Sequence, residues 1–176
     1  MKTNIALIGF MGTGKTAVGK LLARKLDKQF IELDRLIERR AGKSIPEIFE
    51  EDGEITFREL EIDTIRDISK NRNSVIACGG GIVLNKINID RLRESSIIIY
   101  LTASPETVLE RTSTTKDIRP LLDVPDPALR IRELLEFRKP FYERAADITV
   151  NTSRLDTHTV AEQIIKRLKE DEGFNL

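Results

Sequence analysis

Cysteine and histidine are almost absent from this chain of 176 residues, which contains one of each, Cys78 and His158. A single thiol excludes an internal disulfide, and it fits a protein that works in a reducing compartment. One cysteine and one histidine also exclude a zinc site built from these two kinds of ligand. We therefore expect a cytoplasmic protein whose chemistry depends on other residue types.

Net charge and long apolar runs are lacking as well. Lysine and arginine together number 29, as do aspartate and glutamate, so no overall field attracts nucleic acid or an anionic membrane. The N-terminal stretch MKTNIALIGF holds an apolar run that is too short for a signal peptide or a membrane span. We expect one domain over residues 1–176 that acts as a monomer and has neither nucleic acid nor a membrane as a partner.

Short segments rich in isoleucine and valine alternate with longer amphipathic segments. Apolar residues on both faces of the short segments are typical of parallel strands that are covered on both sides. Strands are predicted at residues 4–10, 30–34, 74–79, 96–103 and 147–153, and helices at 15–27, 34–41, 46–70, 87–94, 105–113, 128–145 and 157–170. The alternation predicts a doubly wound α/β fold.

A phosphate-binding loop is the most specific motif. GFMGTGKT, residues Gly9–Thr16, matches G-x-x-x-x-G-K-[ST] in full and lies between a predicted strand and a predicted helix, as the motif requires. Its glycines let backbone N–H groups turn toward phosphate oxygens, and the helix that follows adds a positive end. Lys15 is predicted to reach the β- and γ-phosphates, and Thr16 to ligate Mg²⁺.

Other polar residues and glycines follow the ends of further strands, where ligands of open α/β sheets bind. FIELD carries Glu32 and Asp34 two residues apart, so both side chains share one face if the strand continues that far. Two acids beside a phosphate loop favour Mg²⁺ binding or acid–base chemistry over a solvated strand end. The run Gly79–Gly81 indicates either a tight turn or close approach of the backbone to a ligand.

A polar segment and three arginines also stand out. The segment TSTTKDIRPLLDVPDP, residues 112–127, is long for a loop in so short a chain, and we interpret it as a lid. Arg119 lies within this segment and could close over phosphates. Together with Arg58 and Arg138, it suits a pocket for a small acceptor that carries a carboxylate.

Taken together, these motifs resemble the shikimate kinase family along nearly the whole chain. They occur in the family's order: GFMGTGKT, FIELDRLIE, GEITFRELE, CGGGIV, ERTSTTKDIRPLL and RKPFYERAAD. Only the first is specific by itself, but the arginine and triple-glycine motifs separate this family from related kinases. The resemblance implies a nucleoside-monophosphate-kinase-like fold with a five-stranded parallel sheet in the order 2-3-1-4-5. It also implies transfer of the γ-phosphoryl group of MgATP to the 3-hydroxyl of shikimate.

The resemblance further implies roles for single residues. Asp34 contacts the acceptor hydroxyl as the expected base, while Lys15 and Arg119 stabilise the transferred group. The acceptor is assigned to Asp34, Phe49, Phe57, Arg58, Gly80, Gly81 and Arg138, within an acceptor-binding region over residues 34–70. ATP is assigned to Gly12, Thr13, Gly14, Lys15, Thr16, Ala17, Arg111, Arg119 and Arg154, and Mg²⁺ to Thr16 and Glu32. Glu32 departs from the aspartate that is usual in the family, and its extra methylene is expected to shift the water-mediated contact with the metal.

Two alternatives remain open at this point. Another small-molecule kinase of the same fold would share the loop and the lid, but it would not explain Gly79–Gly81 together with Arg58 and Arg138. A GTP-dependent switch would carry N-K-x-D after the fourth strand. The similar string NKIN, residues 85–88, has asparagine in place of the aspartate and follows the third predicted strand instead.

Overall fold

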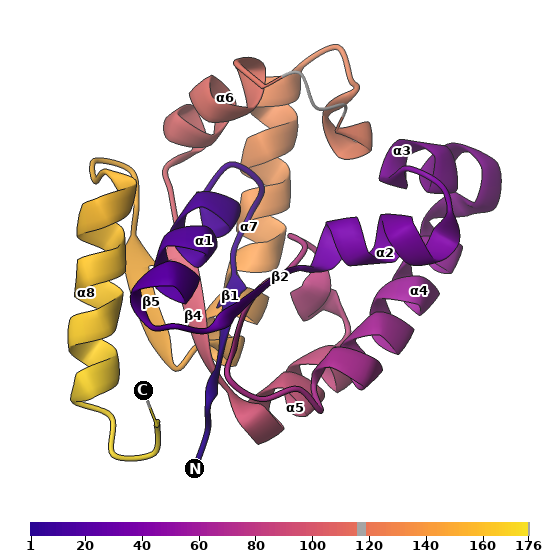
Figure 1. Cartoon of the computed structure of the whole chain (residues 1–176). Helices are drawn as coiled ribbons and strands as arrows, with labels where there is room; N and C mark the ends of the chain where they lie inside the picture. The colour runs from indigo at the N-terminus through magenta and orange to yellow at the C-terminus, as the bar shows by residue number, and fades with distance from the viewer. Residues whose placement is uncertain (116–118, 176) are drawn as a thin grey trace.

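The computed structural model describes residues 1–115 and 119–175. In this part of the chain, a five-stranded parallel sheet has the order β2-β3-β1-β4-β5 (Figure 1). Its strands are β1 (Asn4–Ile8), β2 (Gln29–Glu32), β3 (Ser74–Ala77), β4 (Ser96–Thr102) and β5 (Ile148–Asn151). The central strand β1 pairs with β3 and β4, so that Ile5 lies beside Val75 and Ile97. The predicted α/β fold and strand order are confirmed.

Helices cover both faces of this sheet. They are α1 (Lys15–Lys25), α2 (Leu33–Ala41), α3 (Ile45–Glu47), α4 (Gly53–Ile68), α5 (Lys86–Ser95), α6 (Pro105–Ser113), α7 (Pro127–Ala145) and α8 (Thr157–Lys169). All but one of the predicted helices agree with these bounds to within two residues at each end. Among the described residues, no helix is both long and apolar enough to cross a membrane.

The exception is the helix predicted over residues 46–70, which is divided into three parts. Ser44 caps α3 through reciprocal hydrogen bonds with Glu47, and α3 continues into a π-helical turn, Ile48–Asp52. The chain then changes direction at Gly53, whose φ of +86° is a conformation that glycine adopts easily. The prediction of one continuous helix was wrong because this glycine was read as part of a helical pattern.

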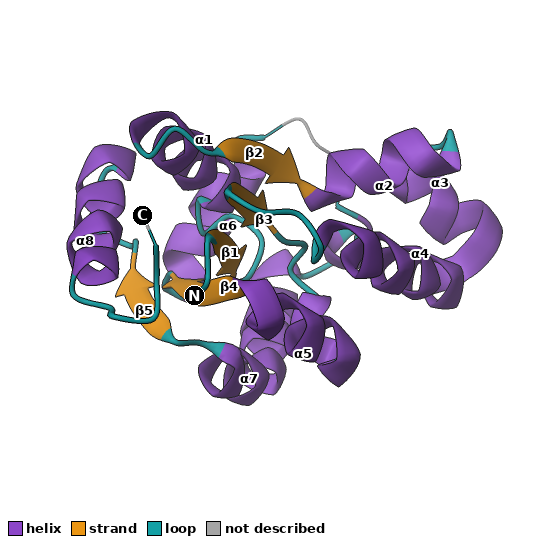
Figure 2. Cartoon of the chain, turned by 60° about the horizontal axis from the view of Figure 1, so that its bottom comes forward, coloured by secondary structure: helices purple, strands orange, loops and turns teal. Residues whose placement is uncertain are grey.

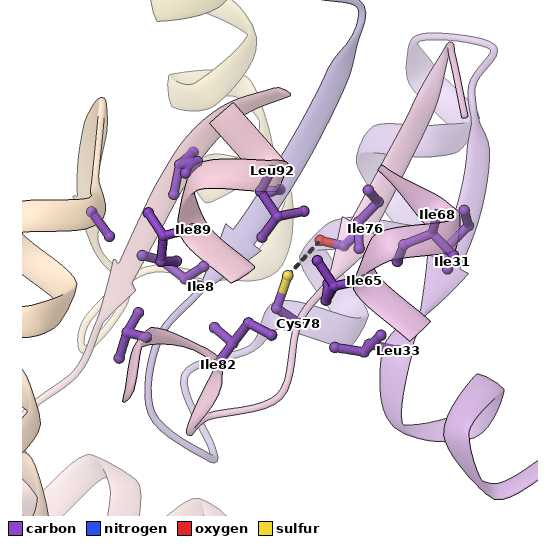
Figure 3. Close-up of a cluster of buried hydrophobic side chains, with 14 of the residues drawn as sticks. Ile8, Ile31, Leu33, Ile65, Ile68, Ile76, Cys78, Ile82, Ile89 and Leu92 are labelled. Atoms are coloured by element: carbon purple, nitrogen blue, oxygen red, sulfur yellow. Dashed lines mark hydrogen bonds between the residues drawn. The ribbon is translucent and has the colours of Figure 1, made fainter. Parts of the chain in front are cut away.

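Alternation along the strands divides the core into two apolar layers, one on each face of the sheet. Ile5 and Leu7 face α1 and α8, whereas Ala6 and Ile8 face the layer formed with α2, α4, α5 and α7. Figure 2 shows α1 and α8 on one side of the sheet and α5 and α7 on the other. Cys78 is buried in the second layer among isoleucine and leucine side chains (Figure 3). Burial raises the pKa of its thiol, so Cys78 stays protonated as a core residue.

A smaller apolar cluster lies near the segment that the sequence predicts to be a lid. It comprises Phe10, Val108, Ile131 and Leu134, and the partly buried Leu121 and Leu122 pack against it. Of the predicted segment 112–127, the first residues complete α6 and residues 120–122 form a 3-10 turn. Residues 116–118 lie outside the described residues. The end of the segment nearest α7 is therefore anchored by leucines that the polar composition of the segment obscured.

Candidate active site

The phosphate-binding loop connects β1 to α1, as its sequence context indicated. Gly9, Gly12 and Gly14 have φ angles of +145°, +75° and +93°, which residues with side chains rarely adopt. At Gly9, a Cβ atom would also lie 2.4 Å from a backbone carbonyl oxygen of β4. Thr13 is buried, and its hydroxyl donates across the turn to the carbonyl of Phe10 at 2.8 Å. The loop therefore has a conformation that requires glycine at three of its positions.

Lys15 begins α1 and turns back into this loop. Its Nζ atom donates to two loop carbonyls, those of Gly9 and Phe10, at 2.8 and 2.7 Å. Burial is the main reason that its pKa falls to about 8. The carboxylate of Asp34 opposes this shift, and the guanidinium groups of Arg119 and Arg138 add to it. Lys15, Asp34, Arg119 and Arg138 thus lie close enough for their charges to interact.

Glu32 and Asp34 do not share a face of one strand, contrary to the sequence-based expectation. The strand β2 ends at Glu32, and α2 begins with the next residue. The helical turn separates the two carboxylates. Glu32 Oε1 accepts a hydrogen bond of 2.7 Å from the hydroxyl of Thr16, whereas Asp34 Oδ1 is buried and has no hydrogen-bond partner among the described residues.

The environment of Asp34 makes its carboxylate a stronger base than usual. Burial raises its pKa above the ordinary value, and Lys15 opposes this shift while the nearby Glu32 and Glu38 add to it. Its Oδ1 atom lies only 3.0 Å from the point where a Cβ atom on Gly79 would stand. The first glycine of the triple-glycine run therefore leaves the space in which this carboxyl group sits.

Arg58, on α4, packs against the same glycine run. A Cβ atom at Gly81 would lie 2.4 Å from each terminal nitrogen of its guanidinium group, so a side chain there would displace Arg58. Arg58 donates to Glu61 Oε2 at 3.2 Å and to Glu54 Oε1 at 3.1 Å, and its guanidinium carbon lies 5.1 Å from the ring centre of Phe57. The close neighbour of the backbone at Gly81 is the side chain of Arg58, and close approach of the glycine run to a ligand stays a prediction.

Glu61 belongs to this cluster of charged residues, and the sequence analysis missed it. It is fully buried, and its Oε1 atom has no hydrogen-bond partner among residues 1–115 and 119–175. Burial raises its pKa to about 7, which Arg58 opposes and Asp34 reinforces. Its position three residues after Arg58 on a helix was the available signal, because side chains at this spacing meet.

Arg138, on α7, also lies against the glycine run. Only 3% of the residue is exposed, and its Nε atom has no hydrogen-bond partner within the described part of the chain. Its guanidinium carbon lies 5.8 Å from the ring centre of Phe10, and Nη1 lies 3.5 Å from the position of a Cβ atom on Gly80. Tyr142, one turn further along α7, donates from its hydroxyl to the carbonyl of Gly80. Burial raises the pKa of Tyr142, so the hydroxyl keeps the proton that it donates.

Arg119 adds a fourth cation from the segment before α7. Its Nε atom is buried, and none of the described residues accepts a hydrogen bond from it. Charges from the phosphate loop, α2, α4, α7 and this segment therefore meet in one region at the carboxyl ends of the strands. Buried ionic groups without partners are unfavourable in isolation, which makes this region suited to a polar ligand that supplies the missing partners.

Two phenylalanines pack together within the region predicted to bind the acceptor. Phe49 lies in the π-helical turn and Phe57 on α4, and their rings are 4.9 Å apart at an angle of 44°. Such a tilted pair packs well and offers an apolar surface without polar groups. The break at Gly53 allows the two rings to meet although they come from different helical segments.

The residues predicted to contact ATP beyond the phosphate loop are only partly brought together. Arg111, on α6, donates to the carbonyl of Gly12 at 3.1 Å and to the hydroxyl and carbonyl of Thr152 at 3.1 and 2.8 Å. Arg154 and Ala17 are exposed. Thr152, which accepts two of these hydrogen bonds, is a second residue that the sequence analysis missed, although it lies two residues before Arg154.

Comparison with known proteins identifies the family of this chain. The family model of shikimate kinase matches residues 11–169. The shikimate kinase of Caldanaerobacter subterraneus subsp. tengcongensis is 53% identical over 163 residues, which cover 93% of this chain and 94% of that protein. The shikimate kinase of Thermodesulfovibrio yellowstonii is 48% identical and covers 93% of each chain. Among solved structures, the shikimate kinase from Acinetobacter baumannii in complex with shikimate superposes with a TM-score of 0.93 at 36% identity, covering 98% of this chain and 96% of that chain. The chain therefore belongs to the shikimate kinase family.

Proposed function

We propose that this chain transfers the γ-phosphoryl group of ATP to the 3-hydroxyl of shikimate, giving shikimate 3-phosphate and ADP. As a member of its family, the chain is an ATP-dependent kinase that phosphorylates shikimate. One observation carries the assignment of the acceptor site. The partly buried Arg58 reaches Gly81 and the buried Arg138 reaches Gly80, while Asp34 Oδ1 lies against the neighbouring Gly79 and has no hydrogen-bond partner among the described residues.

The acceptor residues divide into those that orient shikimate and one that handles its proton. Arg58 and Arg138 pair with the carboxylate, and the small Gly80 and Gly81 leave room for it beside them. Phe49 and Phe57 line the apolar part of the pocket. Asp34 accepts or directs the proton of the attacking hydroxyl, and the raised pKa of its carboxyl group supports this role because a stronger base accepts a proton more readily.

The donor residues surround the phosphates. Backbone N–H groups of Gly12–Thr16 hold the phosphate oxygens, while Lys15 and Arg119 neutralise charge on the transferred group. Arg111, Arg154 and Ala17 belong to the nucleotide side of the site. Residues 112–127 act as a lid that closes Arg119 over the phosphates and keeps water from competing for the phosphoryl group.

The residues present also fit a magnesium ion. Thr16 Oγ1 and Glu32 Oε1 lie 2.7 Å apart and offer the hard oxygen atoms that Mg²⁺ prefers. No group of three or more histidine, cysteine, aspartate or glutamate side chains forms a metal cluster in the described residues. Mg²⁺ sites of kinases need no such cluster, because substrate phosphates provide further ligands. Thr16 and Glu32 would hold the ion, which would neutralise phosphate charge when bound.

All of these residues belong to one chain, so we propose that the enzyme acts as a monomer and needs no nucleic acid or membrane. The single buried cysteine is compatible with the cytoplasmic location expected from the sequence.

Release of ADP by the purified protein tests this function. With ATP and Mg²⁺ present, the rate should rise strongly on addition of shikimate, and only weakly with gluconate or nucleoside monophosphates. GTP should replace ATP poorly. Equal activity with all acceptors, or a strong preference for GTP, would contradict the proposal.

The carboxylate clamp is tested by Arg58→Ala and Arg138→Ala, with Arg132→Ala as an exposed control on the same helix as Arg138. Loss of a hydrogen bond between charged groups is worth about 1.5–3 kcal/mol, so shikimate binding should weaken at least about tenfold. ATP binding should change much less. If either variant weakened ATP binding as much as shikimate binding, the clamp would be wrong.

A further inference from the structure

Thr152 lies at a junction between the end of the sheet and the phosphate loop. It follows β5, is 2% exposed, and its backbone N–H donates to the carbonyl of Thr102 at the end of β4, at 2.8 Å. Its hydroxyl oxygen lies 3.0 Å from that carbonyl and 3.1 Å from the carbonyl of Thr13 in the loop. Arg111 donates to the same hydroxyl at 3.1 Å. One buried hydroxyl thus contacts β4, the loop and α6.

Arg111 holds the neighbouring peptide group of the loop. The nitrogen that donates to the Thr152 hydroxyl also donates to the carbonyl of Gly12 at 3.1 Å, and the other terminal nitrogen donates to the carbonyl of Thr152 at 2.8 Å. α6 itself packs close to the loop, since a Cβ atom on Gly12 would lie 3.2 Å from the Thr112 methyl group. The carbonyls of Gly12 and Thr13 are therefore both fixed by this one pair of side chains.

Fixing these carbonyls also fixes the direction of two N–H groups. A peptide unit is planar, and in the trans form its C=O and N–H point in opposite directions. All peptide bonds among the described residues are trans. When the carbonyls of Gly12 and Thr13 point toward the junction, the N–H groups of Thr13 and Gly14 must point away from it. Such loop N–H groups are the ones that cradle phosphates in this motif.

We propose that Arg111 and Thr152 are positioning residues that direct the N–H groups of Thr13 and Gly14 at the phosphates of the nucleotide. The inference rests on the proposed function only in taking a polyphosphate as the ligand of the loop. It gives Arg111, so far assigned only to the nucleotide side of the site, a defined task. It also predicts that loss of the Thr152 hydroxyl weakens binding of the polyphosphate itself, whether or not a base is attached.

Calorimetric titration with three probes tests the proposal: inorganic tripolyphosphate, ADP and shikimate. Thr152→Val removes the hydroxyl at nearly constant shape, and Thr152→Ser keeps it. In Thr152→Val, tripolyphosphate and ADP should each bind about two- to tenfold more weakly, as expected for one lost hydrogen bond, while shikimate binding stays unchanged. Thr152→Ser should stay within about twofold of the parent protein for all three probes.

Several results would overturn it. Unchanged tripolyphosphate binding by Thr152→Val would do so, as would equal losses in the valine and serine variants or an equal loss of shikimate binding. Thermal unfolding checks that each variant is folded. If Thr152→Val does not fold, Arg111→Lys replaces it, because lysine keeps the charge but cannot hold Gly12 and Thr152 together. The same selective loss of tripolyphosphate is expected there, and its absence refutes the proposal. Failure of the proposed function would appear separately, as a parent protein whose ADP release does not respond to shikimate.

Discussion

Gly81→Ala should damage the acceptor site without unfolding the protein. Gly81 has a φ of −93°, which any residue adopts, so alanine brings no backbone strain. Its new Cβ atom would nevertheless fall 2.4 Å from both terminal nitrogens of Arg58, where ordinary contact begins at 3.4 Å. The guanidinium group is the end of a flexible side chain, so it is Arg58 that moves, by about the 1 Å difference between these distances.

Such a shift is enough to break a hydrogen bond between charged groups. The lost contact with the shikimate carboxylate is worth about 1.5–3 kcal/mol, which corresponds to roughly ten- to hundredfold weaker shikimate binding. ATP affinity should stay within about twofold, and calorimetry measures both. In an Arg58→Ala background, Gly81→Ala should add little further loss, because the residue it displaces is gone. Additive losses, or normal shikimate binding by Gly81→Ala, would refute the reasoning.

Three further predictions concern the charged groups. Lys15→Ala should lower the turnover number by roughly 10²–10³. The melting temperature should stay nearly unchanged, because burial of this ammonium already disfavours its charged form. A large loss of stability would contradict this prediction. Asp34→Asn should lower the rate by about 10²–10⁴, and excess Mg²⁺ should not restore it. Glu32→Gln should raise the Mg²⁺ concentration needed for half-maximal rate, and high Mg²⁺ should restore its activity. A Mg²⁺ titration that gives the reverse would exchange the two roles. Glu61 has a folded-state pKa raised from 4.5 to about 7, so its contribution to stability is fully present below about pH 4.5 and is lost as the pH rises through 7. Thermal unfolding should therefore show the parent protein losing more stability than Glu61→Gln between pH 5 and pH 8, by a few degrees in melting temperature, and parallel pH profiles would count against it.

The fold was predictable because its signals are local and repeated. Strands that are apolar on both faces and a loop motif between a strand and a helix predict a parallel sheet, and the strand order followed from the family resemblance. The break after Ile48–Asp52 was not predictable from apolar spacing, since a π-helical turn and an α-helix place apolar residues at similar intervals. Gly53 was the visible clue, because glycine interrupts a helix where the backbone needs a positive φ.

The site was predictable where a motif names the residue and unpredictable where only packing does. Lys15 and Thr16 follow from the loop pattern, and Arg58 and Arg138 from the family resemblance. Glu61 and Thr152 belong to no specific pattern, because glutamate on a helix and threonine after a strand are common. Their involvement depends on long-range contacts, such as the one between Thr152 and Thr13, which lie 139 residues apart in the chain. Glu32 and Asp34 show the converse error, since a strand that ends two residues earlier than predicted gives these two acids different surroundings.

Unpaired atoms of buried charged side chains, unlike those of the uncharged Asn88 and Ser96, lie where the proposed function needs them. Among the described residues, the buried charged side chains that leave an atom without a hydrogen-bond partner are Asp34, Glu61, Arg119 and Arg138, and all four belong to the proposed site. Folding alone would favour apolar replacements at such positions, because a buried unsatisfied group costs about 1–3 kcal/mol. The rest of the core consists mainly of isoleucine, leucine and valine packed on both faces of the sheet. Local rules of folding are therefore broken where shikimate and the phosphates are expected to complete the hydrogen bonds, and this coincidence is the strongest physical argument that these charges serve the reaction.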